Sequence, residues 1–131
     1  MKRSNNLGKW TYHANAGIHL SDSETEALYH DWKQVMSVNL AGVWLSNQAT
    51  NSQMLVTRHG SKINQSSISA LCGFPGSTAH AASREAVKSL TRQAAIESDK
   101  QGIRIDVICP GAINLHFWLG DRKMAWVIKT I

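Results

Sequence analysis

Three side chains near the middle of the chain have types and spacing suited to acid–base chemistry: Ser67, His80 and Arg84. A histidine titrates near neutrality without help, so His80 is a candidate for proton transfer. Arg84 follows four residues later and, on a helix, shares a face with His80. Its permanent positive charge is expected to lower the pKa of the histidine, which favours a neutral base over an acid.

The segments that must position these residues alternate between short extended and longer helical stretches, which is typical of a βαβαβ unit. The first helical stretch is predicted to kink near residues 37–39, and beyond residue 113 only a few helical turns near Met124 are expected. Strands are predicted over 9–14, 61–67 and 103–109, and helices over 25–58 and 77–102.

The middle strand has a weak signal, because Lys62, Asn64 and Gln65 are polar residues in a segment that a parallel sheet should bury. The helix that follows has clearer boundaries. Ser77 or Thr78 can cap its start, and the last predicted helix ends at a glycine, Gly102.

Composition limits the class of protein. A chain of 131 residues with 43% hydrophobic and 18% charged residues is expected to form one soluble globular domain. It contains no apolar run of about 18 residues and no secretory signal, so no membrane partner and a cytoplasmic location are expected. The net charge of +5 is scattered, which argues against nucleic acid as a partner. Cysteine and histidine spacings give no metal site.

Five motifs, in order, resemble the short-chain dehydrogenase/reductase family (SDR). In that family a serine is followed thirteen positions later by the tyrosine of Y-x-x-x-K, and here His80 and Arg84 stand in the tyrosine and lysine positions after Ser67. The motifs are N-A-G at 15–17, S-V-N-L-A-G-V-W-L at 37–45, I-N-Q-S-S at 63–67, H-x-x-x-R at 80–84 and G-I-R-I-D-V-I-C-P-G at 102–111.

The resemblance implies an NAD(P)-dependent oxidoreductase that transfers hydride between alcohols and carbonyls. It implies that Ser67 holds the substrate oxygen, that Asn39 is the fourth catalytic member, and that the positions of His80 and Arg84 move the proton and bind the ribose. NAD or NADP is the implied cofactor. The implied cofactor-binding residues are Asn15, Gly17, Pro110 and Gly111.

The chain also departs from the family pattern. The glycine-rich turn T-G-x-x-x-G-x-G, whose backbone amides hold the pyrophosphate, has no counterpart. Leu115 replaces a threonine after the third strand, and Asp106 replaces an asparagine. The resemblance therefore implies a chain truncated at both ends, with residues 1–131 forming a single partial domain. Residues 8–115 resemble the C-terminal half of the family, residues 116–131 are an unmatched tail, and the cofactor is not expected to bind this chain alone.

The predicted fold class is α/β, a partial Rossmann-like parallel sheet of about three strands with two long helices, lacking the N-terminal dinucleotide-binding half. Two right-handed crossovers that advance in one direction place both helices on the same face of the sheet. The other face would be bare, which predicts an aggregation-prone chain of marginal stability as a monomer.

Several functional hypotheses follow. His80 and Arg84 are explained most economically by drift after catalysis was lost, which makes the chain an inactive or fragmentary SDR member; an adapted H-x-x-x-R catalyst is the second hypothesis. Without coenzyme, Ser67 would cap a turn and Asn39 would bond the backbone of its own kinked helix. The alternative is a non-catalytic module that pairs with itself or with a full-length relative, since the family uses the two long helices as its subunit interface.

Overall fold

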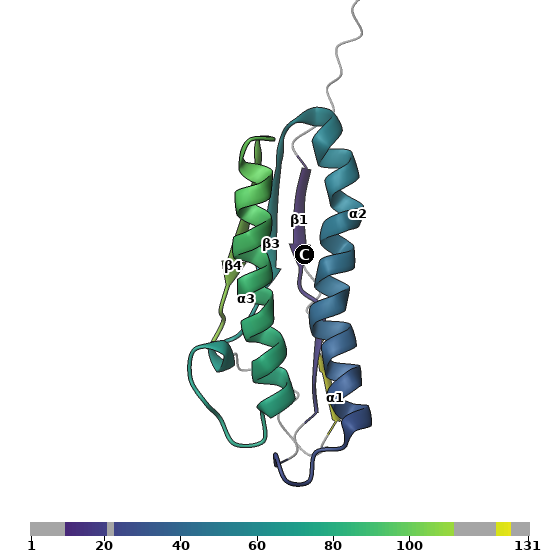
Figure 1. Cartoon of the computed structure of the whole chain (residues 1–131), viewed down its shortest axis with the longest axis vertical. Coiled ribbons are helices and arrows are strands. Elements are labelled where there is room, and N and C mark those ends of the chain that lie inside the picture. Colours follow the sequence, from purple (N-terminus) through teal and green to yellow (C-terminus); the bar gives the residue numbers. More distant parts are fainter. Residues whose placement is uncertain (1–9, 21–22, 112–122, 127–131) are drawn as a thin grey trace, which may run out of the picture.

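The computed structural model describes residues 10–20, 23–111 and 123–126. Its main sheet is parallel, with the strand order β1-β3-β4 (Figure 1). Tyr12, Lys62 and Ile105 lie side by side across the three strands. The sheet confirms the predicted α/β class. Its strands are β1 (Trp10–Ala14), β3 (Gly60–Gln65) and β4 (Ile103–Ile108).

Two long helical segments connect these strands. The first begins at Tyr29 rather than near residue 25, because the backbone amides of Glu26 and Ala27 both donate to the carbonyl of Ser23 in a turn. The predicted kink is a π-helical turn, η1, inserted between two α-helices. The segments are α1 (Tyr29–Met36), η1 (Ser37–Ala41), α2 (Gly42–Thr57), the short 3₁₀ helix η2 (Ile68–Ala70) and α3 (Thr78–Asp99).

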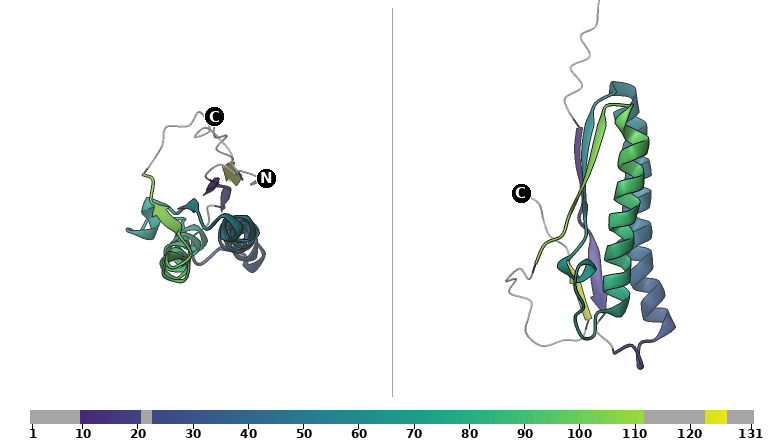
Figure 2. Two further views of the ribbon diagram at one scale, coloured as in Figure 1. Left: turned by 90° about the horizontal axis from the view of Figure 1, so that it is seen from above. Right: turned by 60° about the vertical axis from the view of Figure 1, so that its left-hand side comes forward.

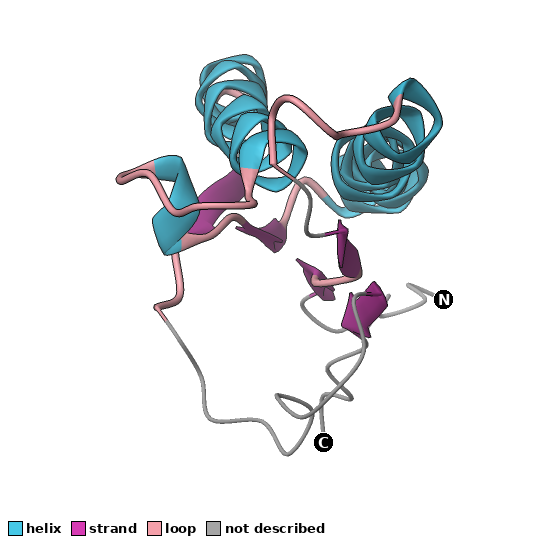
Figure 3. Ribbon diagram, turned by 90° about the horizontal axis from the view of Figure 1, so that it is seen from below, coloured by secondary structure: helices cyan, strands magenta, loops and turns pink. Residues whose placement is uncertain are grey.

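Both long helical segments pack against one face of the sheet, as handedness predicts (Figures 2 and 3). Two apolar clusters fill the layer between helices and strands. One is centred on Ala14, Val43 and Val87, and the other on Met54 and two isoleucines of β4. The half-buried Tyr12 packs against both clusters and so joins them.

The opposite face of the sheet carries no helix among the described residues, but it is more polar than a bare parallel sheet was expected to be. The Arg104 guanidinium lies 2.8 Å from the Asp106 carboxylate and donates to the Ser61 hydroxyl at 3.0 Å. Asp106, the departure from the family asparagine, thus has an exposed ion-pair partner. These charges oppose the aggregation that an apolar face would promote.

A second, two-stranded sheet was not predicted from the sequence. β2 (Gly17–Leu20) pairs antiparallel with β5 (Lys123–Trp126), and Ile18 stands opposite Ala125. The expectation of helical turns near Met124 is therefore wrong. Residues 123–126 form a strand because they pair with β2, which lies more than a hundred residues earlier in the sequence. Local periodicity carries no sign of pairing over such a distance.

The polar residues of β3 lie inside the protein, between the sheet and the helices. Lys62 and Asn64 are fully buried. The Lys62 ammonium donates to the Asn47 carbonyl at 2.7 Å and to the side-chain oxygen of Asn51, both on α2. The Asn64 amide donates to the Thr91 hydroxyl on α3 at 3.0 Å. Hydrogen bonding to both helices thus allows a polar central strand to be buried.

Lys62 provides a test of this layer. We expect Lys62→Met to raise the unfolding free energy at pH 7 by on the order of 1 kcal/mol, because an apolar side chain of similar length removes the cost of burying the ammonium. Burial lowers the pKa of Lys62 to about 8, against about 10.4 in the unfolded chain. The unfolded state therefore binds more protons between these values, and wild-type stability rises with pH across that window.

Urea denaturation at pH 7, 8, 9 and 10 measures both effects. The advantage of Lys62→Met should shrink as the pH rises, and Lys100→Met, at an exposed lysine beyond α3, should show no such trend. A Lys62→Met variant that is less stable than the wild type at pH 7 would contradict this account.

Candidate functional site

Asn39 is the residue around which the candidate site is organised. It lies in the π-helical turn η1 and is completely buried. Its side-chain oxygen accepts from the Ile18 amide at 2.8 Å, and its side-chain nitrogen donates to the Ile18 carbonyl at 2.9 Å and to the Ser83 hydroxyl at 3.0 Å. Asn39 therefore bonds β2 and α3 rather than its own helix backbone, which corrects the structural role expected for it.

His80 lies in the first turns of α3 and faces β2. Its Nδ1 lies 3.2 Å from the Ile18 carbonyl oxygen, and its ring centroid lies 4.9 Å from that of His19. Burial, the charge of Arg84 and the proximity of His19 lower the pKa of His80 to about 4, although the hydrogen bond to Ile18 acts in the opposite direction. The expected depression by Arg84 is present, but burial is the larger cause.

Arg84 is buried one turn further along α3. Its Nη1 donates to the Gln65 carbonyl at 2.8 Å, and its own carbonyl accepts from the Ser66 hydroxyl at 2.8 Å. The guanidinium also packs directly on Gly17, where an added Cβ would collide with Nη2. A glycine is therefore required at position 17 for this arginine to lie inward. Burial lowers the pKa of Arg84 to about 10, so the group remains charged at pH 7.

Ser67 stands at the end of β3, and its hydroxyl is used within its own turn. It accepts from the Ser69 amide at 3.2 Å and from the Ser69 hydroxyl at 2.9 Å. Ser67 thereby caps the 3₁₀ helix η2, the structural role expected for it. The structure thus brings Asn39, His80 and Arg84 together around β2, whereas the described hydrogen bonds of Ser67 stay within its turn.

The four residues implied to bind a cofactor follow the strands of the main sheet. Asn15 lies between β1 and β2, Gly17 is the first residue of β2, and Pro110 and Gly111 lie just after β4. The Pro110 carbonyl accepts from the Ile68 amide at 2.8 Å, which joins this segment to the Ser67 turn. Gly111 has open space where a Cβ would stand.

The Arg84 guanidinium does not point toward a cofactor as the resemblance implies for the lysine position. The lysine position is expected to bind a ribose, yet the Arg84 guanidinium is directed at the Gln65 carbonyl and packed on Gly17. A planar guanidinium fills a different volume from an ammonium and carries its donors in a fixed fork. The residues at this position therefore do not fit the implied ribose contact.

Two residues of the site were missed by sequence reasoning. The His19 Nε2 lies 3.1 Å from the Gly76 carbonyl and 3.4 Å from the Ser77 hydroxyl. The Ser77 side chain makes no cap hydrogen bond to α3, although it was a predicted cap. Ser83 donates to the His80 carbonyl at 2.7 Å and connects it to Asn39. Ser83 follows His80 by three residues on the predicted helix, so the sequence could have indicated that both lie on one helix face. His19 reaches the site only through strand β2, which was not predicted.

Two other classes of site are absent from the described part of the chain. It contains no group of three or more histidine, cysteine or acidic side chains that could hold a metal ion. Within the same ranges, none of the helices has the length and apolar character needed to cross a membrane.

Comparison with known proteins gives a consistent family. The short chain dehydrogenase family profile matches residues 9–123. The chain is 41% identical over 99 residues to the inactive 2-(S)-hydroxypropyl-CoM dehydrogenase 2 of Xanthobacter autotrophicus, covering 76% of this chain and 43% of that protein. It is 31% identical to the meso-2,3-butanediol dehydrogenase of Serratia marcescens, covering 81% of this chain and 42% of that protein.

Solved structures give the same assignment. The structure of ElxO with NADP bound superposes with a TM-score of 0.75 at 34% sequence identity, covering 78% of this chain and 42% of ElxO. NAD+-bound xylitol dehydrogenase gives a TM-score of 0.73 at 27% identity, covering 79% and 41% respectively. The chain spans less than half the length of these relatives. It carries part of the Rossmann-like fold of these oxidoreductases, and it belongs to the short-chain dehydrogenase/reductase family.

Proposed function

We propose that this chain is a catalytically inactive member of the NAD(P)-dependent short-chain oxidoreductases, acting in the cytoplasm and not binding NAD or NADP by itself. The observation that carries the proposal is the hydrogen bond of His80 to the Ile18 carbonyl. A carbonyl only accepts, so this contact requires a proton on Nδ1 and leaves Nε2 with the lone pair when the ring is neutral. Reduction of a carbonyl needs a proton donor at this position, and a neutral His80 has no second proton to donate.

The pKa of His80 supports the same conclusion. At about 4, roughly one molecule in a thousand carries an imidazolium at pH 7. General acid–base catalysis is most effective when the pKa lies near the working pH, so His80 is a poor acid and also a weak base toward an alcohol. The inward position of Arg84 removes the expected cation from the ribose side. The X. autotrophicus relative at 41% identity is itself described as inactive.

The neutrality of His80 predicts a pH effect on stability. Its pKa is about 4 when folded and about 6.5 when unfolded, so the unfolded state binds more protons between these values. Stability is therefore lost as the pH falls from about 6.5 toward 4, by about 1 to 2 kcal/mol between pH 7 and pH 5.

Denaturation at pH 7 and pH 5 measures this loss, and it should be much smaller in His80→Gln. His59→Gln, at an exposed loop position, is the control and should keep the full loss. An NMR titration that gives His80 a pKa above 6 would contradict the proposed site chemistry.

The proposal also predicts the outcome of an activity assay. Purified protein should neither reduce carbonyls with NADH or NADPH nor oxidise secondary alcohols with NAD+ or NADP+ above the background given by the His80→Ala variant. NADH fluorescence should not change when protein is titrated into it. Turnover that disappears in His80→Ala would overturn the inactive assignment and favour the adapted H-x-x-x-R catalyst.

A second function, a non-catalytic oligomerising module, is favoured by helix α2. Its sixteen residues include no ionisable side chain, whereas a solvent-facing helix normally carries charges. It also exposes large apolar side chains, which marks a contact surface. These are Trp44, Leu45, Leu55 and Val56. We propose that α2 pairs with the same helix of a second copy, or with a full-length relative.

This second proposal predicts a dimer in sedimentation equilibrium, with a thermal midpoint that rises with protein concentration. Leu45→Glu should weaken self-association by tenfold or more, because it places a charge at an apolar contact. Gln101→Glu makes the same change in charge in an exposed turn beyond α3 and should leave association unchanged. A monomer with a cooperative, concentration-independent transition would contradict self-association and the expected marginal stability alike.

A further inference from the structure

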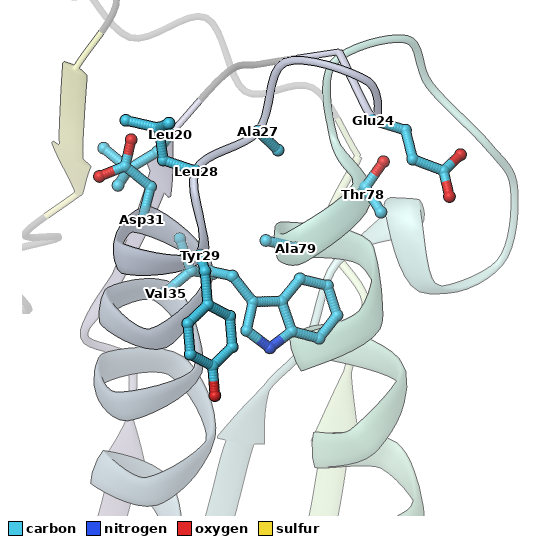
Figure 4. Close-up of a pocket in the computed structure, with 10 residues that line it drawn as sticks. Leu20, Glu24, Ala27, Leu28, Tyr29, Asp31, Val35, Thr78 and Ala79 are labelled. Atoms are coloured by element: carbon cyan, nitrogen blue, oxygen red, sulfur yellow. The ribbon is translucent and has the colours of Figure 1, made fainter.

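A cavity of about 300 Å³ lies at one end of the helical layer, beside the start of α3 that also carries His80. It is open on one side and is bounded by Leu20, residues 24–28, the first turns of α1 and the first turn of α3 (Figure 4). Leu20, Val35 and Ala79 are among its lining residues. None of the four implied catalytic residues lines it.

The interior of the cavity suits an apolar group. Trp32 and Tyr29 contribute aromatic rings, and the remaining lining residues of α1 and α3 include Val35 and Ala79. Apart from the polar atoms of the two aromatic side chains, the Thr78 hydroxyl is the only uncharged polar side-chain group among the lining residues. A volume of this size is at the small end for ligand pockets and accommodates a single ring or a short alkyl chain.

The rim of the cavity is acidic. The carboxylates of Glu24 and Asp31 lie on opposite sides of it, with Ala27 between them (Figure 4), and no lysine or arginine is among the lining residues. Asp31 accepts from His30 Nδ1 through one oxygen at 3.0 Å, which leaves its other oxygen for a ligand. Two carboxylates over an apolar interior favour a positively charged group at the entrance.

The sequence concentrates negative charge at this place. Three of the nine acidic residues, Glu24, Glu26 and Asp31, fall in the described segment 23–31, and no lysine or arginine occurs in the sequence between Lys9 and Lys33. The whole chain nevertheless has a formal charge of +5. The acidic segment therefore creates a local negative potential on a positively charged protein, which attracts cations selectively to this end.

One of the aromatic rings already contacts a cation. The Lys33 ammonium lies 5.0 Å from the centroid of the Tyr29 ring, within the range of a cation–π interaction. The same ring stands at the cavity. That face of Tyr29 is thus already occupied by the protein's own cation, and the partners left for a ligand ammonium group are the rim carboxylates.

We propose that this cavity binds a small organic cation, a primary amine with an aromatic or short alkyl body. The apolar body enters between α1 and α3, where Trp32, Val35 and Ala79 surround it. The ammonium group stays at the rim, in the negative potential of Glu24 and Asp31 on its two sides. The recognition elements are the apolar interior and the two carboxylates together.

NMR titration of the full chain with 2-phenylethylamine tests this proposal. The indole N–H of Trp32 and the methyl group of Ala79 should shift, with a dissociation constant on the order of 1 mM for a ligand of this size. The neutral 2-phenylethanol should bind several-fold more weakly, and the anionic phenylacetate should not bind. Ala27→Phe should block the cavity and abolish the shifts.

A pair of charge variants separates recognition from folding. Glu24→Gln combined with Asp31→Asn should weaken the amine about three- to tenfold, since each rim carboxylate contributes a modest, screened interaction, while the affinity for the alcohol stays the same. Glu97→Gln combined with Asp99→Asn makes an equal charge change at the far end of α3 and should leave the amine affinity unchanged. Equal affinities for the amine and the alcohol, equal losses in both double variants, or no shift at Trp32 and Ala79 would each overturn the proposal.

Discussion

The alternating polar side chains of β3 and of Ser66 directly after it are the constraint on which the rest of the structure depends. Lys62, Asn64 and Ser66 point toward the helices, and each bonds a helix: Lys62 bonds α2, whereas Asn64 and Ser66 bond α3. A buried polar group without a partner would cost more free energy than most single contacts provide. The central strand therefore fixes the positions of both helices by hydrogen bonding, while the apolar clusters on either side supply non-directional attraction.

The candidate site inherits its geometry from this arrangement. Ser66 bonds the Arg84 carbonyl, and so α3 is held where Arg84 reaches the Gln65 carbonyl and Gly17. On the other side, Asn39 bonds both backbone groups of Ile18 and also reaches α3 through Ser83. His80 is thereby held in a partly buried place beside Arg84, and burial lowers its pKa although the Ile18 carbonyl acts in the opposite direction. The family framework is retained, and it now holds a histidine and an arginine whose pKa values are both lowered by burial.

Much of the fold could be predicted from the sequence because its signals are local. The helical spacing of apolar residues, the turn glycines and the strand-ending Pro110 predicted the boundaries of the three main-sheet strands and both long helical segments to within a few residues. The break near Ser37–Asn39 was also visible, although only the structure identified it as a π-helical turn. The β2–β5 sheet could not be predicted, because backbone pairing between residues far apart leaves no period in either segment. His19 was missed for the same reason.

By itself, the sequence determined the family, the class of fold and the substitutions at positions 80 and 84, because these depend on residue types and on spacing along the chain. Tertiary structure decided how those residues behave. The low pKa of His80, the inward guanidinium of Arg84 and the burial of Lys62 all depend on which groups lie nearby in space. Desolvation and hydrogen bonding act over a few ångströms between segments that are distant in sequence. For that reason they are readable only once the chain is folded.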